Sequence, residues 1–77
     1  MATLVMSDIQ PRARAALAAS PIFELQALEV QERDTALWIS GTVSTFYHKQ
    51  LAQEVVRSVC QDIEVVNKIR VREDRRR

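Results

Sequence analysis

The first run of apolar positions along the chain has helical spacing and lies between residues 7 and 20. Its members are Ile9, Ala13, Ala16 and Leu17. The segment is rich in alanine, which has the highest intrinsic helix propensity. Pro11 falls in the expected first turn, where backbone N–H groups have no partner within the helix, and Pro21 restricts the residue before it. The pattern therefore predicts a helix over residues 8–19.

Beyond Pro21 the spacing of apolar residues changes from helical to alternating. Leu28 and Val30 alternate with small or polar neighbours, and the polar stretch ERDT follows. A second alternation then consists of Leu37, Ile39, Gly41 and Val43. Two alternating segments around a polar turn predict a hairpin of two strands.

Gly41 is the only glycine of the chain, and it falls on the side of the second strand that must be covered. A residue without Cβ allows a helix to approach the sheet closely, or allows the strand to bend at its end. We expect Gly41 to have one of these two structural roles.

Helical spacing returns over the stretch STFYHKQLAQEVVRSV, with Ser44 or Thr45 as the expected N-cap. Its apolar stripe consists of Leu51, Ala52, Val55, Val56 and Val59. The last alternating segment, residues 63–71, has Val65 and Ile69 on one side and Val66 and Lys68 on the other. It predicts a third strand.

These elements predict an α+β fold in the order αββαβ. The apolar sides of the two helices and the three strands are all buried when both helices pack on one face of a three-stranded sheet. We expect a right-handed crossover into the third strand, which would lie beside the first in an all-antiparallel sheet. The other face then has no cover from this chain.

Composition indicates one small globular domain, since the 77 residues are 47% hydrophobic and 27% charged. A net charge of +1 is too small to favour either nucleic acid or a membrane as a partner, and base-stacking aromatic residues beyond Trp38 are missing. Positive charge concentrates at the C-terminal end of the chain, in Arg70, Arg72, Arg75, Arg76 and Arg77. This segment is expected to be a solvated tail, with contact to an anionic surface as the alternative.

Candidate chemistry is sparse. Cys60 is the single cysteine, so an internal disulfide is excluded, and His48 alone cannot complete a zinc site with it. No phosphate-binding glycine loop and no nucleophile with a base at recognisable spacing is present, so we expect neither an enzyme nor a cofactor. The N-terminal stretch lacks the features of a secretory signal, and a cytoplasmic location is expected.

Two stretches resemble the BON domain, a small bacterial module. LWISGTV has the family's apolar-x-apolar-x-Gly-x-Val pattern, and VVNKIRV has its Val-x-Asn-x-apolar-x-Val pattern. The family's usual Gly-Val before the third strand is replaced by Gln61 and Asp62, with Ile63 expected to supply the apolar contact. The resemblance implies an αββαβ domain over residues 8–71, after an extension of residues 1–7 and before a tail of residues 72–77. It also implies attachment to phospholipid membranes or envelope surfaces.

Trp38 is the main candidate for function, because strand alternation turns it onto the uncovered face. The partner-binding residues expected there are Trp38, Val66, Lys68 and Arg70. The alternative is that Leu4, Val5 and Met6 shield Trp38. His48 is expected to be a boundary or core residue with a satisfied hydrogen bond, Asn67 to bond a loop or helix end, and Cys60 to fill space.

Two hypotheses follow for function. In the first, the domain docks on a protein partner or on itself through the open sheet face. In the second, it associates with an anionic phospholipid membrane or envelope surface through Arg72, Arg75, Arg76 and Arg77.

Overall fold

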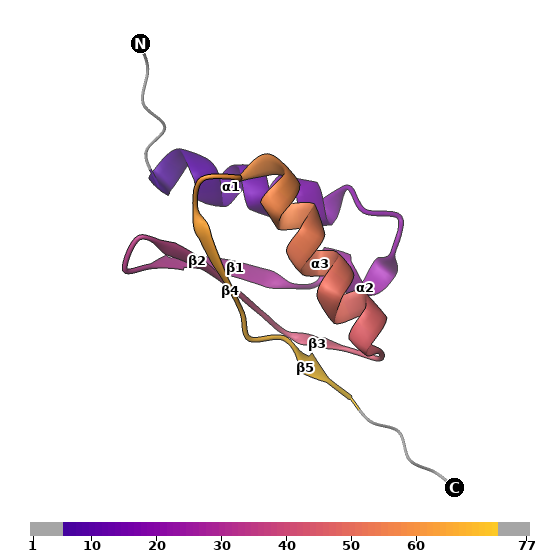
Figure 1. The fold of residues 1–77 in the computed structure, drawn as a ribbon. Helices are drawn as coiled ribbons and strands as arrows, with labels where there is room; N and C mark the ends of the chain where they lie inside the picture. Colours follow the sequence, from indigo (N-terminus) through magenta and orange to yellow (C-terminus); the bar gives the residue numbers. More distant parts are fainter. Residues whose placement is uncertain (1–5, 73–77) are drawn as a thin grey trace, which may run out of the picture.

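The structure, a computed structural model, describes residues 6–72, with side chains from residue 9 onward. Its elements are α1 (Met6–Ala18), α2 (Phe23–Gln26), β1 (Glu29–Arg33), β2 (Ala36–Ser40), β3 (Thr42–Val43), α3 (Phe46–Val59), β4 (Glu64–Asn67) and β5 (Arg70–Val71). Figure 1 shows the helices on one side of the strands. The α+β fold and the common face of the two long helices are confirmed.

The core lies between the two long helices and one face of the sheet. Its helical residues are Ile9, Ala13 and Leu17 of α1 and Ala52 and Val56 of α3. They pack on Val30, Leu37 and Ile39 of the strands, which are at most 1% exposed. The apolar stripes predicted from spacing therefore point into the core.

The order of the strands differs from expectation. The sheet has the order β1-β2-β4, with β1 antiparallel and β4 parallel to β2, so the predicted all-antiparallel sheet with the third strand beside the first is wrong. β2 is buried or half-buried along its whole length, whereas β1 is exposed at four of its five residues. An apolar strand gains most from the central place, and a charged strand suits an edge. Because α3 carries the chain back to the start of β2, β4 runs parallel to it.

Each of the two long predicted strands is divided in two. Gly41 separates β2 from β3, and Lys68 and Ile69 separate β4 from β5. The pairing keeps one register across the break, since Ile39 lies opposite Asn67 and Thr42 opposite Arg70. The Lys68 N–H donates to the Ile39 carbonyl at 2.8 Å, and the Arg70 N–H donates to the Gly41 carbonyl at 2.9 Å. The interruption is therefore a bend without a change of register.

Gly41 makes this bend with a φ of 136°, a conformation that other residues rarely adopt. A Cβ at this position would lie 2.6 Å from Cδ2 of Leu28. The expected bend of the strand at Gly41 is confirmed. The segment that approaches Gly41 closely is not a helix, which was the other expectation, but Leu28, directly before β1.

Two local details depart from the pattern. The hairpin turn consists of Asp34 and Thr35, whose positive φ values of 49° and 62° are those of a two-residue turn of type I′. Glu32 and Arg33, expected in the turn, belong to β1. The helix α2 was not predicted, because four residues are too few to show a helical period.

Polar side chains hold α3 in place. Thr45 caps it, since its hydroxyl accepts the His48 N–H at 3.0 Å. Asn67 of β4 donates to the Lys49 carbonyl at 3.0 Å and to Gln53 at 3.1 Å, which confirms its expected role. Ile63 is half-buried against the core, so it supplies the apolar contact where the chain has Gln61 and Asp62 in place of Gly-Val.

Candidate binding surfaces

The first candidate surface is the sheet face opposite the helices, called here the open sheet face. Strand alternation places Trp38 at its centre. Gln31 of β1 lies opposite Trp38 on one side, and Val66 of β4 lies opposite it on the other. Trp38 and Val66 are both half-buried, although the described helices lie on the other side of the strands. The structure thus brings Trp38 and Val66 together, and a third predicted residue, Lys68, lies over the Trp38 ring.

Two cations cover the ring of Trp38. The Arg33 guanidinium carbon lies 4.7 Å from the ring centroid, and the Lys68 ammonium lies 5.8 Å from it. Both distances are within the range of cation–π attraction. The indole Nε1 is buried and has no hydrogen-bond partner among the described residues. An unsatisfied buried donor costs about 1–3 kcal/mol, so the described residues leave this polar group of Trp38 uncompensated.

Arg33 was missing from the predicted set, and Arg70 is separated from the rest. Arg33 lies opposite Ala36 and on the same face as Trp38. A hairpin turn of two residues, Asp34 and Thr35, would have placed Arg33 in the strand and predicted this position. Arg70 is exposed on β5 opposite Thr42, beyond the bend. The proposed shield of Leu4, Val5 and Met6 lies outside the described side chains.

The second candidate surface is the end of the molecule where α2 meets the start of α3. Phe23 is 78% exposed, Phe46 72% and Tyr47 67%, which makes them the large apolar side chains most open to solvent in the described part. We call these three residues the aromatic end. Figure 1 shows α2 beside the first turn of α3. The sequence contains one indication of the aromatic end. Phe46 lies one turn before Gln50, so this large apolar residue falls on the polar side of the helix.

Glu24 joins the segments of this end. Its Oε1 accepts the Ser44 N–H at 2.9 Å, the Ser44 hydroxyl at 3.1 Å and His48 Nδ1 at 2.8 Å. Its Oε2 lies 3.3 Å from a guanidinium nitrogen of Arg72. The backbone N–H of Ser44 above all, and then the side chain of His48, lower the pKa of Glu24 from 4.5 to about 2.

His48 fulfils its expected role, since its side chain is 25% exposed and its ring nitrogen is bonded. An ionised carboxylate only accepts hydrogen bonds, so the proton on Nδ1 belongs to the histidine. Arg72, predicted to meet an anionic surface, is exposed and paired with Glu24, while Arg75, Arg76 and Arg77 lie outside the described residues.

A family model of the BON domain matches residues 7–73. The chain belongs to the BON family. BON domains are α+β and non-enzymatic, and the match indicates a small binding module. A search of the curated proteins found no significant match.

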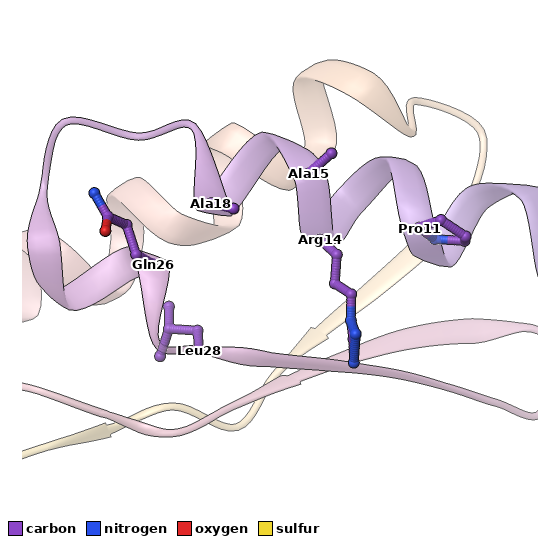
Figure 2. A pocket seen from close by; sticks show the side chains of 6 residues that line it. All are labelled: Pro11, Arg14, Ala15, Ala18, Gln26 and Leu28. Atoms are coloured by element: carbon purple, nitrogen blue, oxygen red, sulfur yellow. The ribbon is translucent and has the colours of Figure 1, made fainter.

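A shallow groove of this BON domain lies along α1, with a volume of about 480 Å³. It is lined by Pro11, Arg14, Ala15, Ala18, Gln26 and Leu28. Figure 2 shows Arg14 reaching from α1 toward β1, the single charged side chain among these residues. One cation in an open apolar groove makes no catalytic or metal site.

The single cysteine of this BON domain, Cys60, is part of the core. Cys60 is 4% exposed, and burial raises its pKa, which suits the expected filler role. Residues 6–72 contain no group of three or more potential metal ligands. Within the same range no helix is long and apolar enough to cross a bilayer.

Proposed function

We propose that this BON domain is a non-enzymatic module that docks on a protein partner, or on a second copy of itself, through the open sheet face. The observation that carries the proposal is Trp38, which lies at the centre of the sheet face turned away from the described helices. Its indole N–H is buried and has no hydrogen-bond partner among the described residues.

The composition of this face supports the proposal. Trp38 and Val66 form an apolar centre, and Arg33 and Lys68 stand at its border. Protein interfaces have the same arrangement, with an apolar core and a polar rim, and tryptophan is among the residues that contribute most to their affinity. Strands on either side hold Trp38, so little side-chain freedom remains to be lost on docking.

The test is Trp38→Ala. We expect association to weaken by about 2 kcal/mol or more, roughly 30-fold, while circular dichroism stays that of the wild type. Sedimentation at several concentrations and a pull-down from native lysate measure the association. Val66→Ser is a second, milder variant on the same face, and Phe46→Ala is the matched aromatic control elsewhere. A folded Trp38→Ala protein that keeps every association would exclude the open sheet face.

A second candidate function is association with an anionic phospholipid surface through the aromatic end. The exposed Phe23, Phe46 and Tyr47 supply apolar and amphipathic groups of the kind that insert at a lipid interface. The hydrogen bond from Arg72 to Glu24 holds the chain at this end just before the basic residues 75–77. Aromatic insertion and basic charge would then act on one surface.

Sedimentation with vesicles that contain anionic lipid tests the second candidate. Deletion of residues 75–77 is expected to weaken binding by up to about 3 kcal/mol, since each basic residue near such a surface contributes about 1 kcal/mol. Phe46→Ser should weaken it too, and Trp38→Ala is the control. Binding that survives both changes, or that ignores salt, would contradict this candidate.

A further inference from the structure

Four charged residues occupy the corners of the open sheet face: Glu29 and Arg33 on β1, Glu64 on β4, and Lys68 directly after it. Arg33 and Glu64 lie on either side of Ala36. Glu29 lies opposite Ser40, and Lys68 reaches the same level, because it follows Asn67, the partner of Ile39. The two positive corners therefore share one diagonal, the two negative corners share the other, and Trp38 lies between them.

This pattern complements itself. Consider a second copy that stacks face to face on the first, related to it by a two-fold axis in the plane of the sheet. An axis along the strands places β1 of one copy over β4 of the other, and an axis across the strands places the Ala36 end of one copy over the Ser40 end of the other. Either arrangement moves every positive corner onto a negative corner, because like charges lie on diagonals. The same operation brings the two Trp38 side chains together at the centre. Such an interface is isologous, the commonest kind in oligomers.

We propose that the occupant of the open sheet face is a second copy of this chain, joined by a two-fold axis through the Trp38 pair with the four corners in alternating charge contact. This inference rests on the proposed function of that face and names its partner. Within the described residues, the ion pairs are those of Glu24 with His48 and with Arg72, so no described partner neutralises any corner. Arg33 and Lys68 rest on the Trp38 ring, from which a facing carboxylate can draw them.

The small size of the face limits the strength of the dimer. Three strands about 4.8 Å apart and five residues long at about 3.3 Å each span roughly 14 Å by 17 Å. Stable interfaces bury about 800 Å² per partner, which is well above this area. We therefore expect a weak dimer, dissociated at micromolar concentration and populated on the order of millimolar concentration, and weaker in high salt because its corner contacts are exposed.

The experiment is sedimentation equilibrium of the whole chain from tens of micromolar to about 1 mM. Wild type should gain mass toward a dimer, and Arg33→Glu or Glu64→Arg alone should raise the dissociation constant at least tenfold. If the axis runs along the strands, Arg33 faces Glu64 of the second copy, and the Arg33→Glu/Glu64→Arg double variant recovers the wild-type value. If the axis runs across the strands, the Arg33→Glu/Glu29→Arg double variant recovers it instead.

Arg57→Glu and Glu54→Arg are the matched charge reversals, since both residues are exposed on α3. Neither should change the dissociation constant, and circular dichroism checks the fold of every variant. Recovery by neither double variant, or a wild type that stays monomeric at 1 mM, would overturn the dimer. If in that case Trp38→Ala still loses a protein captured by the wild type, the proposed function stands and the partner is another protein. If Trp38→Ala loses nothing, both fail.

Discussion

The open sheet face and the aromatic end present aromatic residues in opposite ways. Trp38 is half-buried in the middle of a sheet, with a cation over its ring from each neighbouring strand. Phe23, Phe46 and Tyr47 protrude from the first turns of two helices and are mostly exposed. A sheet face whose side chains are held at fixed strand positions suits a protein of fixed shape, whereas protruding side chains suit a fluid lipid interface. The same small domain thus has two surfaces with different physical demands.

Gly41 lies between these two regions of the chain. It follows β2, which carries Trp38 on the open sheet face, and it precedes β3, which leads to α3 and the aromatic end. We expect Gly41→Val to have the largest effect on stability, a loss of about 1–3 kcal/mol. A valine would have to adopt a φ of 136° and place its Cβ 2.6 Å from Leu28. Urea unfolding measures the loss, with Thr42→Val at the next, exposed position as the control. An unfolding curve equal to that of the wild type would contradict this account of the bend.

Glu24→Gln tests the aromatic end alone. The pKa of Glu24 is lowered from 4.5 to about 2 in the folded state, so its stabilising contribution is present above pH 4.5 and is lost as the pH falls toward 2. The melting temperature of Glu24→Gln should therefore lie below that of the wild type at pH 7, and the gap should close between pH 4.5 and pH 2. Glu54→Gln, an exposed change on α3, supplies the baseline. A gap that does not depend on pH would contradict the role of the carboxylate.

Cys60→Ser should leave both surfaces as they are and has the smallest expected effect. The thiol is buried, and burial raises its pKa, so little reactive thiolate forms in the folded domain. Slow reaction with a thiol reagent in the native state, and fast reaction in urea, would confirm this. Loss of association in a folded Cys60→Ser protein would reveal a thiol function.

Strand period predicts part of the open sheet face, but the sequence analysis missed Arg33 and included Arg70, which lies beyond the bend. Trp38, Val66 and Lys68 share a parity that places them on one face, and the helical stripes show which face is covered. The order of the strands in the sheet could not be predicted from the sequence, since the alternation of apolar residues along a strand does not reveal which strand lies beside it. The Glu24 cluster could not be predicted either: Ser44, His48 and Arg72 come from 20, 24 and 48 residues further along the chain.

The fluorescence of Trp38 tests the division between the two surfaces most directly, because it is the only tryptophan of the chain. If the open sheet face binds protein, the emission maximum should move to shorter wavelength as the concentration of the chain rises toward 1 mM or as a protein partner is added. Anionic vesicles, bound at the aromatic end, should leave the maximum where it is. A shift caused by vesicles, with none caused by protein at any concentration, would contradict the assignment of the open sheet face to protein docking.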